Sequence, residues 1–100
     1  MLLVTGYVYV TPAELTLFLT DFAALASVTR QRNGNISYDT AVLDAQSGKL
    51  LVTERWADQT ALSNHLNASN TEAFIIKWRG QMQGDIQKYD VLNERDLLEG

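Results

Sequence analysis

The sequence predicts a single α+β domain in which an antiparallel sheet carries helices on one face. Three observations lead to this class. The chain has 100 residues, which suits one domain with one modest core. Its composition, 46% hydrophobic and 20% charged, is typical of a globular protein. Segments with strand-like alternation occur on either side of segments with helical periodicity.

The first third of the chain predicts a strand and then a helix. Residues Leu2–Val10 are rich in β-branched and aromatic side chains, which favour a strand. Thr11 suits an N-cap, Pro12 suits the first helical position, and Glu14 completes a capping box. We expect the helix to continue to about Gln31. Its apolar stripe consists of Leu15, Phe18, Leu19, Phe22, Leu25 and Ala26.

The middle of the chain predicts a hairpin. The pair Asn33-Gly34 is typical of a turn. Residues Ile36–Asp44 then alternate as a strand, Gln46–Lys49 form a loop, and Leu50–Trp56 return as the next strand.

Two further helices are expected after the hairpin. Asp58 is a suitable N-cap for a short helix over Gln59–Leu66. Ser69, with Glu72 three residues later, predicts a second capping box. The helix that follows carries Phe74, Ile75, Trp78 and Met82 at helical spacing and is expected to end near Gly80 or Gly84.

The last predicted strand is Ile86–Leu92, and a charged tail follows it. The order is therefore β-α-β-β-α-β with the second helix broken in two, which is the ferredoxin-like arrangement. We assign residues 1–93 to the domain and residues 94–100 to the tail.

The two faces of the predicted sheet differ in their expected partners. The even-numbered residues of 2–10, 36–42 and 50–56 are the more apolar set and should face the helices. The opposite face holds Leu3, Tyr7, Tyr9 and Leu51, with Tyr89 or Val91, and is too apolar to be left in water. We therefore expect a homodimer in which a second copy packs on this face.

Composition and missing motifs exclude several classes of function. Twelve acidic and eight basic residues give a net charge of −4, which disfavours binding to nucleic acid or to an anionic membrane. Without cysteine there is no disulfide, thiolate nucleophile or cysteine-bound metal, and a single histidine leaves no histidine-rich metal site. Neither a signal peptide nor a membrane span is visible, so a soluble cytoplasmic domain is expected.

Glycine-based phosphate cradles are also absent. There is no GxGxxG, Walker, GxSxG or HExxH motif, which argues against a standard NAD, flavin or ATP enzyme.

Three short motifs occur together in the middle of the chain: Gly34-Asn35-Ile36-Ser37-Tyr38, Glu54-Arg55-Trp56, and Ala61-Leu62 with His65-Leu66. With them, residues 1–93 resemble the antibiotic biosynthesis monooxygenase family. The resemblance implies a dimeric α+β barrel with a pocket between the helices and the helix-facing side of the sheet. Members include cofactor-independent quinol or polyketide oxygenases, haem-degrading enzymes and small-molecule isomerases, and others have no known reaction.

The haem-degrading branch fits this chain poorly. Its members carry an Asn on strand 1, a Trp in the second helix and a proximal His ten residues later. The corresponding places here are Gly6, His65 and Ile75, so the axial ligand is missing. No haem, flavin, metal or other cofactor is expected.

The candidate site consists of residues that the family resemblance places around the pocket. His65 is the expected proton acceptor, because its ordinary pKa of ~6.5 lies near neutrality, and Trp56 is the second candidate catalytic residue. The candidate substrate-binding residues are Tyr38, Glu54, Leu62, Leu66, Asn70 and Phe74. Asn70 lies near the place where relatives often have a second His. Glu54 has two interpretations, a pocket acid with a raised pKa or a structural residue at the end of a strand.

Two functions follow from this site. The first is a cofactor-independent monooxygenase, or a related oxidoreductase, for an aromatic, quinol-like small molecule. The alternative is a non-catalytic dimeric module that binds a small molecule or regulates a partner. An isomerase on the same fold would need a His or acid pair, which a single His makes harder.

Overall fold

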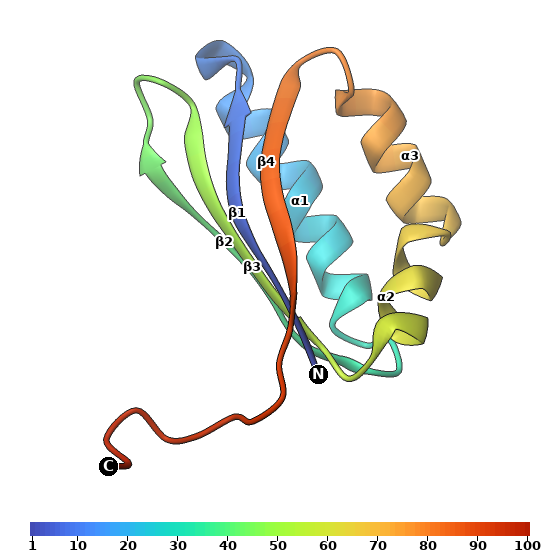
Figure 1. Ribbon diagram of the computed structural model, residues 1–100. Coiled ribbons are helices and arrows are strands. Elements are labelled where there is room, and N and C mark those ends of the chain that lie inside the picture. The colour runs from blue at the N-terminus through green and yellow to red at the C-terminus, as the bar shows by residue number, and fades with distance from the viewer.

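The structure, a computed structural model that describes residues 1–100, is a four-stranded antiparallel sheet with helices on one face (Figure 1). Its elements are β1 (Leu2–Val10), a 3₁₀ turn (Pro12–Glu14), α1 (Leu15–Thr29), β2 (Asn35–Asp44), β3 (Lys49–Trp56), α2 (Gln59–Leu66), α3 (Ser69–Trp78) and β4 (Met82–Asp90). The strand order is β2-β3-β1-β4. The predicted α+β class and the ferredoxin-like order are confirmed.

Strand β1 lies at the centre of the sheet and pairs along its length with β3 on one side and β4 on the other. The even-numbered residues of β1 and β3 face the helices, as predicted, and Leu50 and Val52 are almost fully buried there. Ile36 of β2 departs from this pattern, because it lies at a register shift between Asn35 and Ser37 and is 48% exposed. The core comprises Leu2, Val8, Val10, Phe18, Phe22, Ala26, Tyr38, Leu50, Val52, Trp56, Leu62 and Trp78.

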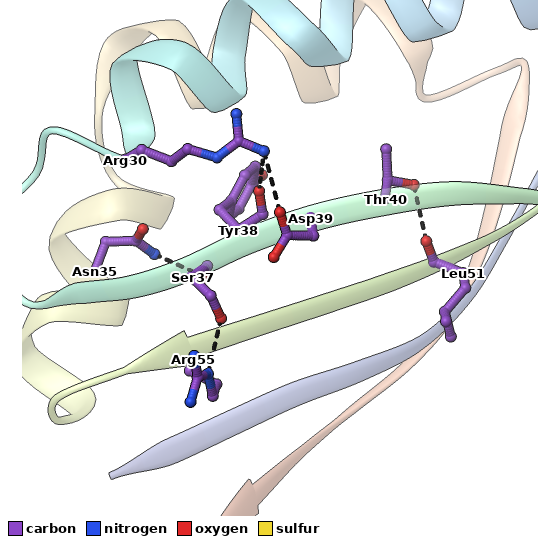
Figure 2. Close-up of polar contacts among 8 residues, drawn as sticks. All are labelled: Arg30, Asn35, Ser37, Tyr38, Asp39, Thr40, Leu51 and Arg55. Atoms are coloured by element: carbon purple, nitrogen blue, oxygen red, sulfur yellow. Dashed lines mark hydrogen bonds and ion pairs between the residues drawn. The ribbon is translucent and has the colours of Figure 1, made fainter.

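Polar contacts hold the edge strand β2 in register (Figure 2). Arg30, just after α1, donates from Nη2 to the Tyr38 carbonyl at 2.7 Å and to the Asp39 carboxylate at 3.2 Å. The Thr40 hydroxyl donates to the Leu51 carbonyl of β3 at 2.8 Å. These contacts connect β2 to the end of α1 and to β3, and Tyr38, paired with Glu54, faces the helix layer.

The helix starts are partly as predicted. Asp58 caps α2, with its carboxylate accepting from the Ala61 N–H at 2.9 Å. Thr11 precedes the 3₁₀ turn and its side chain makes no capping bond. The capping box at Ser69 is wrong, because Ser69 is already helical and Ala68 is the N-cap residue. None of the helices combines the length and the apolar character needed to cross a membrane.

The boundary between α3 and β4 is the largest error of the sequence prediction. Helix α3 ends at Trp78, and Met82, predicted to be helical, is the first residue of β4. The strand begins four residues earlier than predicted because Met82 pairs with Val10 at the far end of β1. Figure 1 shows the residues after β4 running away from the helices.

Candidate functional site

Two aromatic side chains contact His65 between the sheet and the helices. The imidazole of His65, from α2, stacks on the Trp56 indole with centroids 4.9 Å apart. Tyr38 meets the imidazole edge-on at 5.2 Å and stacks on Phe22 of α1 at 5.2 Å. His65, Trp56 and Tyr38 are all buried. The structure therefore brings together the two predicted catalytic residues and Tyr38.

Arg32, in the turn after α1, is hydrogen-bonded to the imidazole of His65. Its Nη1 donates to His65 Nδ1 at 2.6 Å and to the Thr71 hydroxyl at 3.0 Å, and its Nη2 donates to the Asn70 side-chain oxygen. A guanidinium group has no acceptor atom, so Nδ1 must be the acceptor. The hydrogen of the neutral imidazole is therefore on Nε2.

This environment changes the acidity of the imidazole. Burial, together with the nearby charge of Arg32, lowers the pKa of His65 to about 4. His65 is thus neutral at pH 7, and the expectation of an ordinary pKa for it is wrong. Its Nδ1 lone pair is already used in the bond from Arg32.

Glu54 is a buried carboxyl group on the same face of the sheet. It lies on β3 between Tyr38 of β2 and Val4 of β1. Its Oε1 accepts from the Trp56 indole N–H at 2.9 Å. Burial raises the pKa of Glu54 to about 7, and the bond from Trp56 only partly opposes this shift. Burial and the Glu54 charge also raise the pKa of the Tyr38 hydroxyl.

The neighbour of Glu54 in sequence, Arg55, does not pair with it. Arg55 points to the opposite face, where it donates to the Ser37 hydroxyl at 3.0 Å and to Glu94 at 3.3 Å. Glu54 forms no ion pair. Of its two interpretations, the geometry favours a pocket acid with a raised pKa.

A cavity of about 340 Å³ opens between α2 and the strands β1 and β4. It is lined by Val4, Glu54, Gln59, Leu62, Leu66, Ile86, Gln87 and Lys88. Lys88 Nζ, from β4, donates to the Gln59 side-chain oxygen of α2 at 2.8 Å and so joins two of its sides. Glu54 is the only acidic residue in this lining.

The structure separates two of the predicted substrate-binding residues from this cavity. Asn70 and Phe74 line a different groove of about 370 Å³ between α1 and α3. The Asp21–Lys77 ion pair, with Nζ 2.7 Å from the carboxylate, lies in that groove. Glu54, Leu62 and Leu66 therefore form one group, Asn70 and Phe74 form another, and Tyr38 packs in the aromatic cluster.

Sequence reasoning missed seven residues of this region: Arg32, Thr71, Val4, Gln59, Ile86, Gln87 and Lys88. Arg32 follows the helix in a polar turn, and its contact with His65 spans 33 residues, so no local pattern marks it. Val4 and Ile86 could have been found, because both flank Gly6 in the β1 and β4 register and face the helix side.

No group of three or more His, Asp or Glu side chains is placed to hold a metal ion. At Gly6, the position compared above with the Asn of haem degraders, a Cβ atom would lie 2.1 Å from the Asp85 carbonyl oxygen. No side chain fits there without movement of β4.

The model of the antibiotic biosynthesis monooxygenase family matches residues 1–76 of this chain. The chain belongs to this family. The match covers β1 to most of α3 and includes Tyr38, Glu54, Trp56 and His65.

Three proteins of other organisms are similar to this chain over most of their length. The "Putative monooxygenase YcnE" of Bacillus subtilis (strain 168) is 25% identical over 77 residues, which are 77% of this chain and 81% of that protein. A crystal structure of a putative antibiotic biosynthesis monooxygenase from Deinococcus radiodurans superposes with a TM-score of 0.87 at 20% identity and covers 99% of this chain and 100% of its own. Rv0793 from Mycobacterium tuberculosis gives a TM-score of 0.82 at 20% identity, over 95% and 98% of the two chains.

Proposed function

We propose that this family member is a cofactor-independent monooxygenase that acts on an aromatic, quinol-like small molecule. The observation that carries the proposal is a buried, unpaired carboxyl group in an apolar cavity beside an aromatic cluster. Dioxygen is a triplet and reacts slowly with closed-shell molecules. An aromatic hydroxyl that loses its proton becomes electron-rich enough to reduce it, and an apolar cavity with a proton acceptor favours that loss.

The reaction balances without an added reductant. A hydroquinone supplies four electrons to one O₂, so that one oxygen atom enters the ring to give a hydroxyquinone and the other leaves as water. Val4, Leu62, Leu66 and Ile86 would contact the apolar part of the ring. Trp56 connects the imidazole of His65, on which it stacks, to the Glu54 carboxyl group that lines the cavity.

Oxygen uptake with a panel of hydroquinones tests this function. We expect uptake above the autoxidation rate, with one O₂ consumed per substrate and no accumulation of hydrogen peroxide. Ile86→Trp should abolish it by filling the cavity, whereas Ile76→Trp, on the exposed side of α3, should not. Tight binding of a hydroquinone without any uptake would contradict the proposal and favour the alternative, a non-catalytic binding module.

We also propose that a second copy covers the outer face of the sheet. This face, defined by Leu3, Tyr7, Tyr9 and Leu51, leaves 38% of each tyrosine exposed. Tyr7 pairs with Leu51 across β1 and β3, so these side chains form a continuous patch, and the Lys49 ammonium lies 4.4 Å from the centre of the Tyr7 ring. An apolar patch of this kind is typical of an interface.

Light scattering checks the dimer. We expect twice the 11.2 kDa mass of the chain at micromolar concentration. Tyr7→Glu or Leu51→Glu should halve that mass, because a charge on the patch cannot be buried without a partner. Ile76→Glu, at an exposed apolar residue outside the patch, is the control. A monomeric wild-type protein would contradict this arrangement.

A further inference from the structure

We propose that Glu54, and not His65, is the proton acceptor of the cavity, and that Arg32 is a positioning residue that keeps His65 a hydrogen-bond donor. The inference rests on the proposed function and assigns roles within it. It also reverses the role expected for His65 from its residue type alone.

The first step concerns the two nitrogens of His65. Nδ1 accepts a hydrogen bond from Arg32 at 2.6 Å, and a guanidinium does not lose its proton in a protein. A proton arriving at Nδ1 would bring two cationic donors together in a buried site. It would also displace Arg32 from Thr71 and Asn70, which it contacts in the same arrangement. Since Nε2 carries the hydrogen, neither nitrogen is free to accept.

The second step concerns the two oxygens of Glu54. Oε1 is engaged by the Trp56 indole N–H. Oε2 has no partner within the chain, and no fully buried side-chain oxygen or nitrogen of the structure lacks one, so Oε2 must reach accessible space. The cavity that Glu54 lines supplies that space. One oxygen is thus fixed and the other is open to a ligand.

The third step concerns the charged and titratable groups around the carboxyl. Tyr38 of β2 lies beside Glu54 in the sheet. His65 of α2 packs against Tyr38 and is hydrogen-bonded to Arg32. Lys88 of β4 lines the cavity. Lys88 is bonded to Gln59, and Glu54 has no ion pair. The carboxyl pKa of about 7 follows mainly from burial, so a substantial fraction is ionised at neutral pH.

The proton transfer itself is simple. The O–H bond of the substrate hydroxyl breaks, its electron pair stays on the substrate oxygen, and the proton binds Oε2. A phenol has a pKa near ~10, so transfer to a carboxylate with a pKa of about 7 is far less unfavourable than transfer to an imidazole with a pKa of about 4. His65 acts through Trp56, on which it stacks and whose indole N–H holds Oε1 in place.

The pH dependence of kcat/KM for oxygen uptake tests this assignment. We expect the wild-type value to rise with pH through about 7, because Glu54 must lose its proton first. Glu54→Gln keeps an acceptor for Trp56 and should lower kcat/KM by roughly 10²- to 10⁴-fold and remove the rise. Glu54→Asp should retain the rise. His65→Gln should lower kcat/KM but retain its rise with pH.

An infrared titration provides a readout without substrate. The carbonyl band of a protonated carboxyl should disappear in the wild-type protein as the pH rises through about 7, and it should be missing in Glu54→Gln. Denaturation curves of the wild-type protein and of Glu54→Gln at one pH check that both are folded.

Three results would overturn the inference. A rate that rises through about 4 and is lost in His65→Gln would make His65 the acceptor and leave the proposed function intact. A Glu54 band that is already absent at pH 5 would remove the acceptor near neutrality, again with the function intact. If the band titrates as expected but no hydroquinone is consumed, the proposed function itself is wrong.

Discussion

Burial shifts the pKa values of Glu54 and His65 in opposite directions, and both shifts favour the uncharged form. The carboxyl pKa moves up to about 7 and the imidazole pKa moves down to about 4. The residue types alone would place the ordinary values in the reverse order, with the imidazole above the carboxyl. In this environment the carboxyl group of Glu54, and not the imidazole of His65, titrates near neutral pH.

Replacement of Arg32 by Leu should raise the pKa of His65, because the guanidinium charge opposes protonation of the imidazole. The value should remain below 6.5, since burial, the larger cause, persists. An NMR titration of the single histidine measures this directly. Arg79→Leu removes an equal charge from an exposed position and should leave the titration unchanged. A lower or unaltered pKa in Arg32→Leu would contradict the placement of the guanidinium at Nδ1.

At this scale the sequence supports only part of the site. The spacing of Leu62, His65 and Leu66 on one short helix correctly predicts that His65 faces the sheet near Trp56. Leu66 is nevertheless 47% exposed, because it lies at the rim of the cavity. The role of Arg32 could not be predicted, since it depends on where a turn after α1 meets a helix many residues later.

Among the elements, β1 and β4 approach each other closely at Gly6. Gly6 of β1 allows it, because a Cβ atom there would lie 2.1 Å from the Asp85 carbonyl oxygen and 2.7 Å from the Ile86 Cα. Backbone atoms of a paired strand cannot move aside as a flexible side chain can. A larger residue at position 6 must therefore displace β4.

Gly6→Ala should destabilise the fold by roughly 1–3 kcal/mol or more, through overpacking against β4. Chemical denaturation measures the change in the free energy of unfolding. Gly84→Ala, on β4 itself, is the matched control, because nothing lies within 4 Å of its added Cβ atom. Equal stability of the two variants would mean that β4 does not lie as closely against β1 as described.

The same pair of strands shows why element boundaries were harder to predict than element types. The residues of β1 are apolar and β-branched, and their own pattern predicts the bounds Leu2–Val10 without error. The sequence of β4 is mostly polar, so its start is decided by pairing with Val10 rather than by its own side chains. For this reason the sequence pattern wrongly predicts a helical position for Met82.

For the whole molecule, Glu54 and His65 should nearly cancel in the pH dependence of stability. Between about 4 and 6.5 the folded state binds fewer protons at His65 than the unfolded chain does, so stability rises with pH. Between about 4.5 and 7 it binds more protons at Glu54, so stability falls with pH. Lys77 lowers the pKa of Asp21 below its ordinary 3.8, outside this window.

Removing either group should leave only the change of stability with pH that the other group causes. Glu54→Gln should be stabilised as the pH rises from 4.5 to 6.5, and His65→Gln should be destabilised over the same range, each by up to about 1.4 kcal/mol per pH unit. Urea denaturation at several pH values provides the comparison. Parallel profiles for the two variants would show that these groups do not titrate as the structure indicates.

The cavity has walls of very different tolerance to mutation. Glu54 and Leu62 are part of the buried interior, whereas Ile86 and Lys88 are exposed residues of an edge strand, which has a neighbour on one side only. Replacing Ile86 and Lys88 by other residues would change the shape and charge of the cavity wall without repacking the core. A laboratory library confined to positions 86 and 88 could therefore search for new ligands while the fold and the Glu54 carboxyl group stay as they are.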